Sequence, residues 1–502
     1  MTRPYFTLPV VAGAAAFLLH LVLNPHYGFF RDELYFIICG RHPQFGYVDQ
    51  PPIVPLLAAA TQAWGQSLVA LRAVPALCSG LSIYVVCLLA RDLGAGKFGQ
   101  VLAALAAFFA PVMTSFGMKV VPDEIGLWTW PLMTLLILHL IRGADARLWL
   151  AVGALLGVTL ESKYTVAFFA VAALIGLIVT PERRVLRTPW FLAGIGIAAV
   201  IALPTFLWQA HYGFPMLELL RNGAIEKNVI LNPLQYVLAQ LVLTNPILSL
   251  VWIAGLVACV RKRELRWFYI AFIALTAMMI AFHAKDYYGA DVYPALFAVG
   301  AAAIAAWVRH PVPRAFIAGI VVVAGLILVP IVEPVLPEPA FIQYMQTLTS
   351  MTHLSRTPSE HLREGTLPQD WADMHGWPEL AATVVRVYDA LPPDERRKAA
   401  IVASNYGEAA AIDFFGGPRG LPPVLSGHNQ YFLWGPRGFS GQVVIDVHGD
   451  CGADAHLFRS ARRAAVFAAP YVLPYEDHMP IMVCRGITVP LGELWPKLKR
   501  YI

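Results

Sequence analysis

Acidic residues gather in two short motifs near the start of the chain. These motifs are Arg31-Asp32-Glu33-Leu34-Tyr35 and Gly46-Tyr47-Val48-Asp49-Gln50-Pro51-Pro52. Adjacent carboxylates such as Asp32 and Glu33 can serve as a general base or bind a hard metal ion. Asp49 precedes a stiff Pro-Pro step that fixes the direction of the backbone. The alternatives are a solvated loop around Asp32 and a helix-capping role for Asp49.

Three further polar motifs stand beside apolar runs. They are Lys119-Val120-Val121-Pro122-Asp123-Glu124, Glu161-Ser162-Lys163-Tyr164 and His283-Ala284-Lys285-Asp286-Tyr287-Tyr288. Because Lys163 lies between two short apolar runs, we expect it in a polar cavity or paired with an acid. An internal ion pair with Glu161 is the simplest alternative. Cations such as Lys163 and Lys285 can also hold a phosphate group.

The composition is that of a membrane protein. The 502 residues are 58% hydrophobic and 14% charged, whereas soluble proteins average about 45–50% and about 25%. This excludes a soluble enzyme, a disordered chain and a fibrous one. Apolar runs recur as far as Pro330 and then end. We therefore expect an α-helical polytopic membrane protein followed by a more polar tail.

The apolar runs predict about eleven transmembrane helices, each near the length needed to cross a bilayer. The predicted spans are 7–23, 67–90, 98–118, 125–141, 147–160, 164–180, 189–208, 234–260, 267–283, 291–308 and 314–332. Alternate loops carry the basic residues, which by the positive-inside rule face the cytoplasm. This pattern predicts a cytoplasmic N-terminus. With an odd number of spans, the tail is extracytoplasmic and the polar motifs share the outer face.

The domain organisation follows from these spans. A transmembrane domain is predicted over 1–333, with short interfacial helices in its first outer loop, 24–66. Residues 334–502 are predicted to form an extracytoplasmic α/β domain, with a helix at 378–390 and strands at 399–403 and 442–447. If this domain is outside the cytoplasm, Cys451 and Cys484 could form a disulfide.

Several functions are disfavoured by what the sequence lacks. No basic run has interleaved aromatic residues, which argues against nucleic-acid binding. No P-loop or dinucleotide-binding motif is present, which argues against an ATP-driven pump. A secondary transporter or a flippase-associated membrane protein is the alternative class. Against a transporter, the polar motifs gather at one face instead of the midplane, and no half-to-half repeat is seen.

The order of these motifs resembles glycosyltransferase family 39. This GT-C family includes protein O-mannosyltransferases, lipid A aminoarabinose transferases and bacterial galacturonosyltransferases of the lipopolysaccharide core. The resemblance rests on Asp-Glu-x-Tyr at 32–35, Gly-Tyr-x-Asp-Gln-Pro-Pro at 46–52, an outer Asp123 and Lys163 between two spans. Tail segments 404–408, 426–429 and 434–436 are similar to tails of this branch.

The resemblance implies a role for each matched residue. Asp32 would be the catalytic base, Glu33 would assist it or bind metal, and Asp49 would be a second catalytic acid. Lys163, Lys285, Tyr287 and Tyr288 would bind the donor phosphate. Gln50 stands where the aminoarabinose transferases have a lysine, so it is carried over as substrate-binding rather than as a phosphate contact. Asp123 is also expected to bind substrate, and His211 is a candidate on its position alone.

The resemblance also implies the reaction. The donor would be a sugar linked to polyprenyl phosphate (undecaprenyl phosphate in bacteria), and the acceptor an envelope glycan, lipid or protein. Transfer would take place at the outer face of the bacterial inner membrane, most simply by an inverting displacement. A covalent glycosyl-enzyme route would instead need two closely spaced carboxylates. No nucleotide is needed, and Asp32, Glu33, Asp49 and Asp123 could hold a divalent cation, Mg²⁺ or Mn²⁺.

Overall fold

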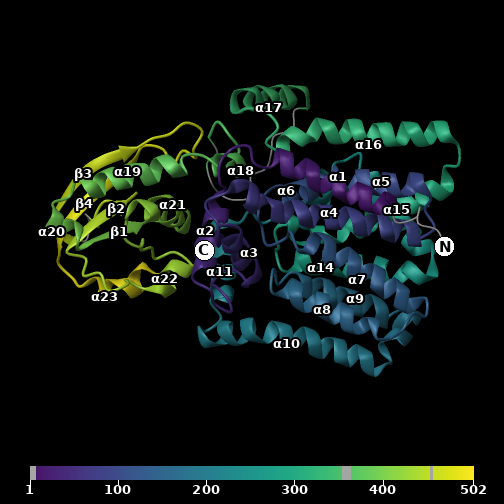
Figure 1. Cartoon of the computed structure of the whole chain (residues 1–502). Coiled ribbons are helices and arrows are strands. Elements are labelled where there is room, and N and C mark those ends of the chain that lie inside the picture. Colours follow the sequence, from purple (N-terminus) through teal and green to yellow (C-terminus); the bar gives the residue numbers. More distant parts are fainter. Residues whose placement is uncertain (1–6, 353–362, 364, 453–455) are drawn as a thin grey trace. The chain divides into compact units, whose positions relative to one another are not determined.

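The computed structural model describes residues 7–352, 363, 365–452 and 456–502 (Figure 1). The chain folds into two compact units. The first unit takes Met1–His26, Val69–Trp208 and Val229–Ser355, and the second takes Tyr27–Leu68, Gln209–Asn228 and Arg356–Ile502. Two segments predicted as outer loops of the membrane part therefore pack in the same unit as the tail.

The first unit is built from helices. They are α1 (Thr7–Leu23), α4 (Leu68–Asp92), α5 (Lys97–Phe108), α6 (Pro111–Met118), α7 (Gly126–Ile141), α8 (Leu148–Leu160), α9 (Val166–Ile178), α10 (Pro189–His211), α12 (Pro233–Leu243), α13 (Ser249–Arg261), α14 (Arg266–Ala281), α15 (Tyr293–Trp307), α16 (Pro311–Val332) and α17 (Glu338–Thr352). Short 3₁₀ turns cover Pro181–Leu186 (η2), Arg263–Leu265 (η4) and Asp286–Val292 (η5).

Each predicted span contains at least one of these apolar helices. Among the described residues, five continuous helical segments are long and apolar enough to cross a membrane: Leu68–Asp92, Pro189–His211, Arg263–Ala281, Asp286–Trp307 and Pro311–Val332. The pair α5 and α6 meets the same criterion together but is bent by 68°. The predicted span 234–260 is two helices, α12 and α13, because Asn245-Pro246 interrupts it. Pro246 cannot continue a regular helix from the residues before it.

Small residues bring the helices of this unit together. A side chain at Gly300 of α15 would overlap the carbonyl of Val251 on α13, so the two helices touch backbone to backbone. Such contacts are typical of helices packed in membranes. In contrast, most of α10 and α16 is exposed and apolar, with residues such as Val200 and Leu326 facing outward. An outward apolar surface of this extent fits contact with lipid.

The second unit combines short helices with a small sheet. Its helices are α2 (Arg31–Arg41), α3 (Ile53–Thr61), α11 (Pro215–Asn222), the π-helical turn η3 (Gly223–Lys227), α18 (Gln369–Ala372), α19 (Trp377–Asp389), α20 (Pro393–Arg396), α21 (Tyr406–Gly416), η6 (Gly417–Arg419), α22 (Gln430–Trp434), α23 (Leu491–Leu494) and η8 (Trp495–Leu498). The short helices predicted within 24–66 are α2 and α3. Helix α2 packs against both α3 and α21.

The sheet of this unit has four strands in the order β1-β2-β4-β3. They are β1 (Ala399–Ala403), β2 (Val443–Val447), β3 (Phe458–Phe467) and β4 (Met479–Ile487). The first two strands are parallel, and the other pairings are antiparallel. Figure 1 shows α19 and α21 running alongside the sheet, and α19 also packs against α21. The sequence predicts α19, β1 and β2 within one residue at each end.

Cys451 and Cys484 are joined in a disulfide. Cys484 lies on β4, beside Val444 of the neighbouring strand β2. Both half-cystines are buried in a small apolar cluster with Leu425 and Trp495. The other four cysteines of the chain are free and buried. The disulfide therefore ties the loop after β2 to the centre of the sheet.

Candidate active site

The first turn of α2 carries the first acidic motif. Helix α2 begins at Arg31, and the carboxylate of Glu33 accepts a hydrogen bond of 2.8 Å from the backbone N–H of Phe30. Acidic side chains are favoured at this end of a helix because the first N–H groups have no partner within it. Glu33 is fully buried. Its position therefore stabilises the helix start that presents Asp32.

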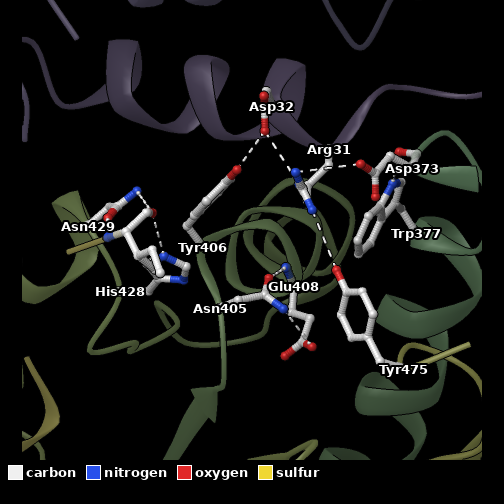
Figure 2. A network of polar contacts seen from close by, with 11 residues as sticks. Arg31, Asp32, Asp373, Trp377, Asn405, Tyr406, Glu408, His428, Asn429 and Tyr475 are labelled. Atoms are coloured by element: carbon white, nitrogen blue, oxygen red, sulfur yellow. Dashed lines mark hydrogen bonds and ion pairs between the residues drawn. The ribbon is translucent and has the colours of Figure 1, made fainter. Parts of the chain in front are cut away.

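Asp32 lies in a polar network but keeps one carboxylate oxygen available (Figure 2). Its Oδ1 accepts a hydrogen bond of 2.8 Å from the hydroxyl of Tyr406 and lies 3.4 Å from Nε of Arg31. Both contacts use the same oxygen, and Oδ2 has no hydrogen-bond partner within the described part of the chain. The side chain is 32% exposed. This geometry suits a group that must receive a proton.

Arg31 connects Asp32 to a buried acidic region. Its guanidinium lies 3.5 Å from Asp373 and 3.5 Å from the Tyr475 hydroxyl. Burial alone would lower the pKa of Arg31, but the nearby acids, Asp373 above all, raise it above its ordinary value. Burial raises the pKa of Glu476 to about 8, and the charge of Asp373 adds to this effect. Arg31 is thus the cation that balances the acids of this region.

Two tyrosines link Asp32 to Asp49. The hydroxyl of Tyr35 donates to Oδ1 of Asp49 at 2.9 Å and accepts from the backbone N–H of Gln430 at 3.1 Å. The rings of Tyr35 and Tyr406 pack with their centroids 4.6 Å apart. Asp32 and Tyr35 are three residues apart on α2, a spacing that puts them on one face of a helix. Asp49 does not cap α3, since that helix begins at Ile53 after Pro52.

Gln50 and His211 have contrasting surroundings. Gln50 is 2% exposed, and neither atom of its side-chain amide has a hydrogen-bond partner among the described residues. A buried amide in this state is costly unless a ligand or water pairs with it. His211 ends α10 and is exposed, with its ring against Tyr212 at 4.8 Å. The structure does not bring His211 into the network of Asp32 and Asp49.

A second polar cluster lies in the first unit. The ammonium of Lys163 is 2.5 Å from Oδ1 of Asp123, a side chain that is 4% exposed. The same ammonium lies 5.2 Å from the ring centre of Tyr287 and 4.5 Å from that of Tyr288, within the range of cation–π attraction. Asp291 is buried and interacts electrostatically with both Asp123 and Lys163. Four of the residues singled out in the sequence therefore meet here.

The contacts of Glu161 decide whether it is the ion-pair partner of Lys163. Glu161 is not the partner of Lys163: its carboxylate accepts a hydrogen bond of 2.6 Å from the hydroxyl of Thr205 on α10. The internal ion pair considered for Glu161 and Lys163 is therefore wrong. Lys285 is half-buried immediately before η5, the turn that carries Tyr287 and Tyr288.

The acids considered as metal ligands do not form a three-ligand group. Within the described residues, one group of three potential ligand atoms lies close enough together, formed by Asp446, Cys451 and Cys484. Two of these three residues are in the disulfide and cannot bind a metal as thiolates. Asp123 is bound to Lys163 and Asp32 to Tyr406. Mg²⁺ is usually held by one or two carboxylates together with waters and substrate phosphates, so a divalent cation at these acids stays a prediction.

Sequence reasoning missed the contribution of the tail to this network. The sequence assigned no catalytic role there, yet Tyr406 contacts Asp32 directly. Asn405 and Glu408 have the spacing of a helix start, which is a readable local signal. The pairing of residues 374 positions apart has no such signal. The link between Tyr406 and Asp32 therefore needed the structure.

Comparisons with known proteins match both the sequence and the fold. Residues 49–208 match the family described as dolichyl-phosphate-mannose-protein mannosyltransferase. The solved structure of ArnT from Cupriavidus metallidurans bound to undecaprenyl phosphate is similar over 95% of this chain and 98% of that one, with a TM-score of 0.58 and 14% identity. The apo structure of the same protein is similar over 94% of this chain and 97% of that one, with a TM-score of 0.58 and 16% identity. No curated protein sequence matches.

The chain has the GT-C fold. The match over 49–208 includes Asp49, Gln50, Asp123 and Lys163, so it covers parts of both polar clusters. The family match and the fold together indicate a glycosyltransferase, in agreement with the sequence resemblance. Its apolar helices make it a multi-pass membrane protein.

Proposed function

We propose that the protein transfers a sugar from a polyprenyl-phosphate donor to an envelope acceptor. Asp32 supports this proposal most directly, because one of its carboxylate oxygens is held by Tyr406 and the other has no partner among the described residues. Because the side chain is 32% exposed, this second oxygen is accessible to an acceptor hydroxyl. ArnT, which shares the fold, binds undecaprenyl phosphate in its solved structure.

The reaction assigns one proton transfer to Asp32. An acceptor hydroxyl gives its proton to Oδ2 as its oxygen attacks the anomeric carbon of the donor sugar. The bond between that carbon and the phosphate oxygen breaks, and polyprenyl phosphate leaves with the electron pair. The configuration at the anomeric carbon is inverted. The side-chain amide of Gln50 has no hydrogen-bond partner among the described residues, and it suits a sugar hydroxyl.

The leaving phosphate is assigned to the cluster around Lys163. Its ammonium has three N–H donors, and the contact with Asp123 uses one of them. The rings of Tyr287 and Tyr288 lie within cation–π range of this ammonium, and tyrosine hydroxyl groups can donate to phosphate oxygens. Charge-assisted bonds of this kind stabilise the developing negative charge on a leaving phosphate. Lys285 is a further candidate for this role.

The reaction is assigned to the outer face of a bacterial inner membrane. Basic residues in alternate loops support a cytoplasmic N-terminus and an extracytoplasmic tail. The disulfide between Cys451 and Cys484 supports the same orientation, because disulfides persist in oxidising compartments. A donor that carries its own leaving group needs no nucleotide at that face. The acceptor is an envelope glycan, lipid or protein.

A donor panel tests this function. Purified protein in lipid is given undecaprenyl phosphate linked to mannose, galacturonic acid or aminoarabinose, together with a bacterial envelope extract. We expect acceptor-dependent release of free undecaprenyl phosphate from one of these donors. Asp32→Asn should lower release about 100-fold or more. The control Asp394→Asn, at an acid 84% exposed on α20, should release at the wild-type rate. Release by no donor, or equal release by all three proteins, contradicts the proposal.

A further inference from the structure

A residue of the tail fixes the orientation of the candidate base. Tyr406 is the first residue of α21, and its hydroxyl donates to Oδ1 of Asp32 at 2.8 Å. Arg31 approaches the same oxygen at 3.4 Å. A carboxylate turns readily about its last side-chain bond, whose rotamers are broad. Two contacts to one oxygen therefore define where the other oxygen points.

Hydrogen bonds at the start of α21 fix the backbone that carries Tyr406. The side chain of Asn405 accepts from the backbone N–H of Glu408 at 2.9 Å and donates to the Glu408 carboxylate at 2.8 Å. The same carboxylate accepts from the N–H of Ser404 at 3.1 Å and contacts Nδ1 of His448 at 2.9 Å. Glu408 is fully buried. These contacts keep the first turn of α21 in one conformation (Figure 2).

The ring of Tyr406 is held from its sides as well. It packs against Tyr35 at 4.6 Å and against His428 at 4.9 Å between ring centres. The guanidinium of Arg31 lies 5.5 Å from its centre. A ring with three neighbours has little freedom to swing away from Asp32. The Tyr406 hydroxyl is thus held in place beside Oδ1 of Asp32.

We propose that Tyr406 is a positioning residue for the transfer reaction, holding Oδ1 of Asp32 so that Oδ2 faces the acceptor hydroxyl. The inference rests on the proposed function, in which Asp32 takes the acceptor proton. It makes the tail a working part of the active site instead of a separate module. Tyr406 forms no bond in the reaction. It acts by keeping Asp32 in the orientation that the proton transfer needs.

The matched variants are Tyr406→Phe and Tyr431→Phe. Each removes one hydroxyl that donates to a carboxylate at 2.8 Å in the same unit, to Asp32 in the first case and to Asp413 in the second. Transfer is measured with the donor selected from the three-sugar panel, giving kcat and the KM for donor separately. We expect Tyr406→Phe to lower kcat about tenfold with little change in KM. Tyr431→Phe should keep the wild-type kcat.

A second pair of variants shows whether the effect passes through Asp32. In Asp32→Glu the longer side chain already misplaces the carboxylate, so adding Tyr406→Phe should lower kcat by less than about threefold. An equal loss in both backgrounds overturns the inference, and so does a Tyr406→Phe enzyme with wild-type kcat. A loss of kcat matched by Tyr431→Phe also overturns it, because the effect is then one of folding.

The proposed function and this inference fail in different ways. If Asp32→Asn transfers sugar at the wild-type rate, Asp32 is not the base, and the proposed function is wrong at that point. If Asp32→Asn is inactive and Tyr406→Phe is not impaired, only the positioning role is wrong.

Discussion

Replacing Lys163 by methionine separates its structural role from its role in the reaction. The ammonium of Lys163 is bound to Asp123, and Asp291 is a second buried acid that interacts with both. Lys163→Met removes the cation and leaves two buried acids beside each other. Breaking a buried ion pair by removing one partner costs about 3–5 kcal/mol. We therefore expect a clearly lower melting temperature in detergent.

Two further variants calibrate this loss. In the double variant Asp123→Asn, Lys163→Met, the unpaired charge of Asp123 is gone, and most of the lost stability should return. Arg142→Met breaks the ion pair between Arg142 and Glu264 in the same unit, in which both side chains are 34% exposed. An exposed pair contributes only about 0–1 kcal/mol. Its melting temperature should stay close to that of the wild type.

Activity then decides whether Lys163 also contacts the donor. The melting temperature and the rate of polyprenyl phosphate release are measured on the same preparations. If Lys163 holds the leaving phosphate, the double variant regains stability but transfers about 10- to 100-fold more slowly, as expected for a lost charge-assisted bond. Recovery of wild-type transfer together with stability would refute the phosphate role. A wild-type melting temperature in Lys163→Met would contradict the expected cost of breaking the buried ion pair between Lys163 and Asp123.

Three further predictions concern the second unit. Because burial raises the pKa of Glu476 to about 8, the folded protein holds a proton that the unfolded chain loses near pH 4.3. This stabilisation is complete at low pH and disappears as the pH rises to about 8, so Glu476→Gln should make the melting temperature less dependent on pH between about 5 and 8. Gly407→Ala places a methyl group against Arg31; this overlap should cost about 1–3 kcal/mol in a melting experiment and slow transfer. Cys451 and Cys484 should resist alkylation until the protein is reduced, and replacing both by serine should cost roughly 2–4 kcal/mol, again measured by melting.

The membrane part was largely predictable because its signals are local. Long apolar runs predicted the helical segments of the first unit as far as α16 but not α17, and turn residues indicated the ends of α19, β1 and β2. The exposed strand β3 was missed because its outward residues are arginine, serine and alanine, which do not alternate with apolar residues in a regular way. The break between α12 and α13 was missed because apolar runs resume within two residues on either side of Asn245-Pro246.

The candidate site was predictable in its parts but not in its connections. Lys163 and the two tyrosines were singled out separately, and their meeting around Asp123 depends on how four helical segments pack. Asp32 was identifiable from its motif, but its contact with Tyr406 joins segments far apart in the chain. The sequence also suggested Glu161 as the partner of Lys163, because the two residues are close neighbours in the chain.

The most direct test of the account compares donor binding with transfer in Asp32→Asn. If Asp32 is the base, this variant should bind undecaprenyl phosphate as tightly as the wild type. At saturating donor it should then transfer sugar about 100-fold more slowly or worse. Equal transfer rates in the two proteins would contradict the account. A loss of transfer explained entirely by weaker donor binding would also contradict it, since Asp32 would then bind the donor instead of taking the proton.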